Sequence, residues 1–250
     1  MPRIVLQAVV CFVVATAALA QTHVTPGRVG MVMVGKASDG FALATDSAST
    51  NADGTLSNAQ KLLPAGKNGV VLFAGAVSIQ DPVGRPVREE VNVARIASAW
   101  LDSHRDTTIQ SAETEINAAV SQAVTKFFST RDPGAESGRY KFAIVFAGYA
   151  DGKPVVSITR YFIPAAKGKA PRAVHASYQA KAGDAWILGG SRQNWKVTGS
   201  SIQELLGSFD SILKTAEEHS SKTARGPLAV IPPNRFATIT LKEGFAVVNR

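Results

Sequence analysis

The stretch from Gly30 to Ser47, GMVMVGKASDGFALATDS, constrains the fold of this chain more than any other. Two runs of small apolar residues flank a Ser-Asp-Gly turn at residues 38–40, and an Asp-Gly pair between such runs is typical of a tight β-hairpin. Successive side chains of a strand point to opposite faces, so Asp46 ends a face whose preceding members are alanines. We therefore expect a hairpin with a carboxylate at the end of its second strand.

The first 20 residues have the features of a secretory signal peptide. Arg3 supplies a positive charge, residues 4–16 are mostly apolar, and residues 18–20 (Ala-Leu-Ala) fit an A-x-A cleavage site. We expect cleavage after Ala20, which would leave Gln21 as the first residue of a periplasmic or secreted protein. The apolar stretch is short for a membrane span, so we expect no stable membrane insertion after cleavage, with an uncleaved anchor as the alternative.

Residues 21–250 are enough for one substantial core, and we expect them to form a single domain. The one cysteine, Cys11, lies in the signal segment. The exported chain would then contain no disulfide, and its stability would depend on packing. The four histidines are scattered, and no Cys/His group has the spacing of metal ligands. We expect neither a metal nor a cofactor.

The chain is basic, with 27 lysines and arginines against 19 acidic residues and a formal net charge of +8. A mild basic cluster comprises Lys167, Lys169, Arg172 and Lys181. Nucleic-acid binding would favour a basic stripe interleaved with aromatic residues, which is absent, so we expect no nucleic-acid partner. We interpret the cluster as ordinary solvated surface, with attraction to anionic lipid or cell wall as a weaker alternative.

Apolar periodicity predicts further hairpins and three helices. The hairpins are expected at residues 141–150 with 154–163 and at 236–241 with 245–248, and the helices around 93–101, 116–127 and 202–216. The polar stretch from 47 to 60 is expected to be a loop. Clustered strands with clustered helices favour an α+β fold over repeated βαβ units, and the amphipathic helices suggest two sheets packed between helices.

Several of these segments resemble one known family. The run DGFALATDS, followed by Lys61-Leu62 and by VVLFAGA at residues 70–76, resembles the opening of proteasome β-type subunits and their bacterial relatives. FAIVFAGYADGKPVVSITR and ATITLKEGFAVV resemble later hairpins of that family, so the resemblance runs from about Gly30 to Val248. It implies an N-terminal-nucleophile (Ntn) hydrolase fold, a four-layer αββα sandwich, and a homo-oligomer, since relatives assemble into rings.

The resemblance also implies site residues. In such enzymes the first residue of the processed chain is a threonine whose hydroxyl attacks a peptide or amide carbonyl. The matching positions place Asp46 and Lys61 beside the nucleophile and assign to Gly75 the backbone N–H that stabilises the oxyanion. Each of these residues could instead have a structural role. The Asp46 carboxylate could accept hydrogen bonds from nearby backbone N–H groups, Lys61 could simply be the ion-pair partner of Asp46, and Gly75 could be retained for close strand packing.

The nucleophile position departs from the family pattern. Counting back from Asp46 across a hairpin centred near Ser38 predicts Gly30 or Val29 opposite the carboxylate, and neither has a nucleophilic side chain. The nearest upstream candidate is Thr25, roughly 16 Å of extended chain away at ~3.3 Å per residue. Thr25 would also need a free α-amine, which requires trimming beyond the signal cleavage site.

Three functions are compatible with this pattern, and the enzymatic status of the chain stays open. We favour a proteasome-like Ntn-fold protein without the threonine nucleophile, retained for assembly or binding. Gly189 and Gly190, where active relatives carry a supporting serine, agree with that interpretation. One alternative is an active threonine-type peptidase or amidohydrolase that uses Thr25 after further trimming, with Lys61 and Asp46 as helpers. The other is a ring-forming structural or binding module of the cell envelope.

Overall fold

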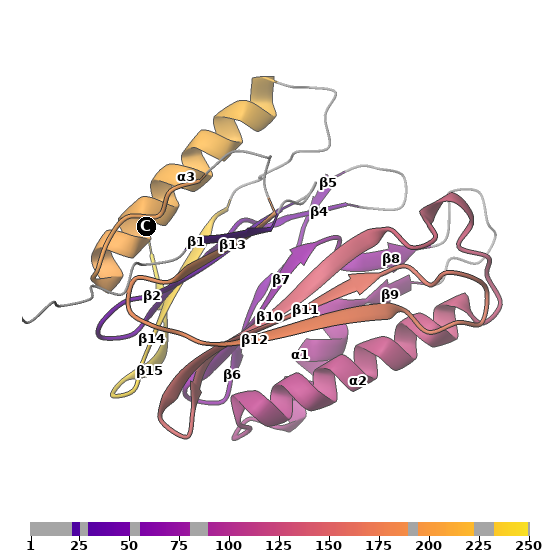
Figure 1. The fold of residues 1–250 in the computed structure, drawn as a ribbon, viewed down its shortest axis with the longest axis horizontal. Coiled ribbons are helices and arrows are strands. Elements are labelled where there is room, and N and C mark those ends of the chain that lie inside the picture. The colour runs from indigo at the N-terminus through magenta and orange to yellow at the C-terminus, as the bar shows by residue number, and fades with distance from the viewer. Residues whose placement is uncertain are drawn as a thin grey trace, which may run out of the picture.

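The computed structural model describes residues 22–25, 30–50, 56–80, 90–189, 195–222 and 233–249. The segment expected to be a signal peptide, residues 1–20, lies outside these ranges. Two large β-sheets and three α-helices make up most of the described fold (Figure 1).

The larger sheet contains the hairpin that dominates the sequence. Its strands, in spatial order, are β1 (Thr22–Thr25), β13 (Ala185–Gly189), β2 (Met31–Lys36), β3 (Phe41–Thr45), β14 (Arg235–Thr240) and β15 (Gly244–Val248). Neighbouring strands are antiparallel except for β1 and β13, which run parallel. The expected hairpins β2–β3 and β14–β15 are confirmed.

The second sheet has five antiparallel strands, in the order β12 (Arg172–Gln179), β11 (Lys153–Phe162), β10 (Tyr140–Ala150), β7 (Gly69–Gly75) and β6 (Leu62–Ala65). The expected β10–β11 hairpin turns at Asp151 and Gly152, whose φ angles of 50° and 74° belong to a turn that favours this Asp-Gly pair. Two short hairpins complete the strands: β4 (Ala48–Thr50) with β5 (Leu56–Asn58), and β8 (Ser78–Gln80) with β9 (Glu90–Asn92). The interpretation of residues 47–60 as a loop was therefore wrong.

The three helices lie where apolar periodicity placed them: α1 (Val93–Ser103), α2 (Ile109–Phe128) and α3 (Ile202–Lys222). A short 3-10 turn, η1 (Gly134–Glu136), follows α2. Asn92 and Thr108 cap α1 and α2, each accepting a hydrogen bond from a backbone N–H of the first turn. Within the described ranges, no helix combines the length and apolar character needed to cross a membrane.

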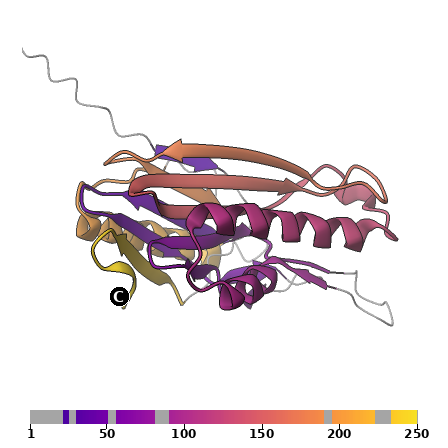
Figure 2. The ribbon, with the colours of Figure 1, turned by 90° about the horizontal axis from the view of Figure 1, so that it is seen from below.

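Three apolar clusters hold these elements together, and β3 shows how the sequence divides its side chains among them. Phe41 and Leu43 point into the cluster between the two sheets, whereas Ala42 and Ala44 face the cluster that contains α3. A third cluster joins α1 and α2 to the outer face of the five-stranded sheet. Figures 1 and 2 show α3 on one side of the two sheets and α1 and α2 on the other. The expected mixed fold, with antiparallel sheets and separate helices, is confirmed.

A capping box begins α3. Ser201 Oγ accepts a hydrogen bond from Glu204 N (3.3 Å), and Glu204 Oε2 accepts from the backbone N–H groups of Ser200 (2.7 Å) and Ser201 (3.1 Å). These backbone hydrogen bonds, that from Ser200 foremost, lower the pKa of Glu204 from 4.5 to about 2. Because the carboxylate form makes the bonds, the cap depends on ionisation of Glu204.

We predict that Glu204→Gln lowers the free energy of unfolding at neutral pH and has less effect in acid. The folded-state pKa lies below the unfolded value, so the contribution is present above about 4.5 and is lost as the pH falls towards about 2. Urea unfolding of both proteins across this range measures the difference. Ser211→Ala, on an exposed position of α3, is the control. A difference that does not change with pH would contradict the prediction.

Candidate functional site

The ends of strands from both sheets carry the residues singled out in the sequence. Asp46 directly follows β3, Lys61 directly precedes β6, and Gly75 is the last residue of β7. Thr25 is the last residue of β1. The structure brings Asp46 and Lys61 into contact and places Gly75 on β7, the strand that pairs with β6. Thr25 lies on the edge strand of the six-stranded sheet.

Asp46 and Lys61 form a buried ion pair. Lys61 Nζ lies 3.0 Å from Asp46 Oδ1, and neither side chain is exposed at all. Phe73 N donates a hydrogen bond to Lys61 O (3.0 Å), which fixes the lysine backbone to β7. Because Asp46 belongs to the β2–β3 hairpin and Lys61 leads into β6, the pair connects the two sheets. The Asp46–Lys61 ion pair, one of the structural alternatives given above, is therefore present.

Burial also changes the acid–base behaviour of the lysine. Loss of hydration lowers the pKa of Lys61 below 10.5, while the charge of Asp46 and its hydrogen bond act in the opposite direction. Among the described residues, Asp46 is the hydrogen-bond partner that the structure shows for Lys61 Nζ. An ion pair removed from water to this degree is retained only when each charge keeps its partner, since an uncompensated buried charge is strongly destabilising.

The carboxylate of Asp46 also binds the main chain of the first hairpin strand. Oδ1 accepts a hydrogen bond from Met31 N (2.8 Å), and Asp46 N donates to Met31 O (3.2 Å). Thr45 Oγ1 lies within hydrogen-bonding distance of two carbonyl oxygens, Met31 O (3.0 Å) and Asp46 O (2.8 Å), and donates to them. Neither acceptor is a base, so the geometry makes Thr45 a structural hydroxyl.

Met31 therefore lies opposite Asp46, and the prediction of Gly30 or Val29 at that place was wrong by one or two positions. The hairpin pairs Lys36 with Phe41, so its centre lies between Ser38 and Asp39 rather than at Ser38. A shift of half a residue at the turn moves every partner across the hairpin by one residue.

The chemistry of Met31 differs from that of a nucleophile with a free amine. Its nitrogen belongs to the peptide bond with Gly30, whose resonance removes the basicity that an α-amine has near neutral pH. Its side chain is fully buried and packs in the apolar cluster with α3. The main-chain group that Met31 presents to Asp46 is therefore neither a base nor a nucleophile.

Gly30 and Gly189 meet backbone to backbone beside this position. Gly189 has a φ of 93°, and a Cβ placed on it would lie 1.9 Å from Gly30 O. A side chain at 189 is therefore excluded both by conformation and by space. Gly189, one of the two glycines expected where active relatives carry a supporting serine, thus has a packing role.

Gly75 has a similar steric explanation. Its φ is 89°, and an added Cβ would lie 2.7 Å from Lys141 O on the paired strand β10. It is two residues beyond Phe73, whose N–H binds the carbonyl of Lys61. Close strand packing accounts for the glycine by itself, and its role towards an oxyanion stays a prediction.

Thr25 is part of the six-stranded sheet. It pairs with Leu188 on β13, and Leu188 pairs in turn with Val32 on β2. Two strand spacings, about 10 Å, therefore separate the Thr25 backbone from β2. A reacting nucleophile has to lie within about 3–3.5 Å of its target, so catalysis by Thr25 beside Asp46 would require a different arrangement of β1.

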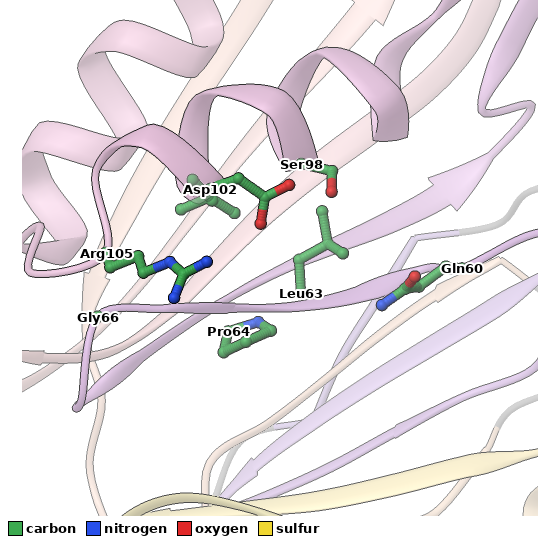
Figure 3. A pocket seen from close by; sticks show the side chains of 8 residues that line it. Gln60, Leu63, Pro64, Gly66, Ser98, Asp102 and Arg105 are labelled. Carbon is green, nitrogen blue, oxygen red and sulfur yellow. The ribbon is translucent and has the colours of Figure 1, made fainter.

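A surface hollow of about 400 Å³ lies between β6 and the end of α1 (Figure 3). The lining residues are Gln60, Leu63, Pro64, Gly66, Ser98, Leu101, Asp102 and Arg105. Figure 3 shows Ser98, Asp102 and Arg105 facing the strand that carries Leu63 and Pro64. Asp46 and Lys61 do not line it, so it is separate from the ion pair. No sequence pattern indicated this hollow, because its walls come from segments without a shared motif.

No group of three or more His, Cys, Asp or Glu side chains in the described ranges could hold a metal ion. The groups that the structure shows in contact at the site are the Asp46 carboxylate, the Lys61 ammonium group and the main chain of Met31.

No protein-family model and no curated protein sequence matches the chain. Among solved structures, the helical assembly of the Anbu complex from Pseudomonas aeruginosa matches with a TM-score of 0.55 at 13% identity, covering 88% of this chain and 87% of that one. Anbu from Hyphomicrobium sp. strain MC1 (15% identity, TM-score 0.46) and Anbu, an ancestral beta-subunit, from Yersinia bercovieri (14%, 0.46) match with the same coverage of both chains. The first likeness shows that this chain shares the fold of the Anbu subunit.

We predict that Lys61→Met lowers the free energy of unfolding by about 3–5 kcal/mol, because it removes the counter-charge that contacts the buried Asp46 carboxylate. The double variant Lys61→Met/Asp46→Asn should be more stable than the single variant, since the amide oxygen still accepts from Met31 N without carrying a charge. Urea unfolding measures both.

The matched control is Lys214→Met, which breaks the exposed Lys214–Asp210 pair of α3 and should cost less than about 1 kcal/mol. A double variant less stable than Lys61→Met alone would show that the two buried charges are not coupled.

Proposed function

We propose that this chain is an exported Ntn-hydrolase-fold protein that lacks threonine-peptidase activity and acts through assembly or binding. The observation that carries the proposal is the hydrogen bond from Met31 N to Asp46 Oδ1. It places an internal peptide nitrogen and a buried methionine beside the ion pair, where the proteasome-like enzymes need an α-amine and a hydroxyl.

We further propose that the four-layer αββα arrangement of that fold applies to this chain. Three observations support it: an apolar cluster between the sheets, a second cluster under α3, and a third under α1 and α2. The fold likeness to the Pseudomonas aeruginosa Anbu structure agrees with this arrangement.

The Asp46–Lys61 pair has a role in such a protein even without catalysis. It joins the two sheets at one end, and replacing either partner alone would leave an unpaired buried charge. A chain that lost its nucleophile would therefore retain both residues for stability. Gly75 would also be retained for a structural reason, because a Cβ at this position would lie too close to Lys141 O.

We propose that the mature chain begins at Gln21, outside the cytoplasm, and forms a homo-oligomer such as a ring. Support for self-association comes from the Pseudomonas aeruginosa Anbu structure, which is a helical assembly. Sedimentation velocity of the mature protein at micromolar concentration tests this, and we expect a species several times the mass of one chain. A monomer across that concentration range would contradict assembly.

We predict that the mature protein does not hydrolyse fluorogenic peptide amides faster than its Lys61→Met variant, and forms no covalent adduct with an epoxyketone directed at N-terminal threonines. The physical reason is that, among the described residues, an internal peptide nitrogen and not an amine-bearing nucleophile donates to Asp46. Activity that is blocked by the inhibitor and lost in Thr25→Ala would overturn the proposal and favour a peptidase that uses Thr25.

A further inference from the structure

The five-stranded sheet ends in a long open edge, strand β12. It pairs with β11 along its whole length, from Arg172 opposite Phe162 to Gln179 opposite Val155, without a shift in register. β12 is the outermost strand of its sheet, and no described residue pairs with its other side. Figure 2 shows it as the uppermost strand, with no helix drawn beyond it. Within the described part of the chain, one row of its main-chain N–H and C=O groups therefore has no strand partner.

β12 differs from the other sheet edges in length and protection. It has eight residues, against four in β1, four in β6 and five in β15. β6 carries the exposed Pro64, a residue that blocks strand addition, whereas β12 contains neither proline nor bulge. Six of the eight residues of β12 are exposed, and Ala176 and Tyr178 are partly buried.

Basic side chains lie at both ends of this edge. Lys167 and Lys169 precede the strand, Arg172 begins it and Lys181 follows it, and all four are exposed. The Arg172 guanidinium is held 3.8 Å from the centroid of the Phe162 ring, so it is ordered along the sheet.

Fewer acidic groups are shown in contact with β12 or its flanks. Glu113 Oε1 of α2 lies 3.4 Å from His175 Nδ1, and Asp184 accepts a hydrogen bond from Lys181 N. The four basic side chains therefore outnumber the acidic ones along this edge.

We propose that β12 is a docking site for an extended acidic segment of a partner protein, which adds to the sheet as a further strand. The open main-chain groups supply the hydrogen bonds, and the basic side chains at the two ends select glutamate- or aspartate-rich sequences. Charge argues against a second copy as the occupant. Antiparallel pairing of two β12 strands would set the Arg172 end of one copy against the Lys181 end of the other, bringing like charges together.

The test uses a fluorescently labelled peptide of alternating glutamate and valine that has the length of β12. Its binding to the mature protein is measured by fluorescence anisotropy. We expect saturable binding that weakens about tenfold in Lys169→Glu/Arg172→Glu. The matched control is Lys196→Glu/Lys242→Glu, which makes the same change in net charge at exposed positions outside the five-stranded sheet and should bind like wild type. An equal loss of peptide affinity in both variants would show that the binding depends only on net charge, and would overturn the proposal.

Two further peptides separate strand addition from charge attraction. The same peptide with N-methyl groups on alternate residues keeps its charge but loses one row of N–H donors, and we expect it to bind at least about tenfold more weakly. A lysine–valine peptide should not bind. Equal binding of the N-methylated peptide, or binding of the lysine peptide, would overturn the proposal.

Sedimentation of the wild-type protein with and without the glutamate–valine peptide tests the second copy as occupant. An assembly that the peptide dissociates would show that copies pair through β12 and would contradict an acidic partner as the occupant. We expect the peptide to leave the assembly intact.

Discussion

The buried ion pair between Asp46 and Lys61 is the interaction on which the rest of this structure depends. Its 3.0 Å contact joins the end of the β2–β3 hairpin to the start of β6, and so connects the two sheets where their strands end. The Asp46 carboxylate also holds the main chain of Met31. Each charge is tolerable only because the other is present, which makes the pair a strict constraint on both positions.

Because folding itself requires the Asp46–Lys61 pair, the presence of these two residues is independent of whether the site is catalytic. The same carboxylate and ammonium that would assist a nucleophile in a proteasome-like enzyme here bind each other and the main chain of Met31. Gly30 and Gly189 fill the adjacent space backbone to backbone, and Met31 directs its side chain into the cluster under α3. A frame that is needed for folding persists without catalysis, so its presence is weak evidence for activity.

Much of the fold could be predicted from local patterns, because hairpin turns and helical periodicity are local properties. The helix stripe of α3 and the Asp-Gly turn of β10–β11 are examples. The partner of Asp46 was missed because register depends on the centre of a turn to within half a residue. The parallel pairing of Thr25 with Leu188 was also unpredictable, since it joins segments more than 160 residues apart and has no local signature. The same holds for the open edge of β12, whose exposure depends on the order of all five strands.

The central claim is that no nucleophile with a free amine stands beside Asp46 and Lys61. Mass spectrometry of the amino terminus of the native mature protein tests it most directly, because Ntn chemistry requires the nucleophile to be the first residue. The account predicts a chain that begins at Gln21. A chain that begins at Thr25 would place a free amine on a threonine and would contradict it.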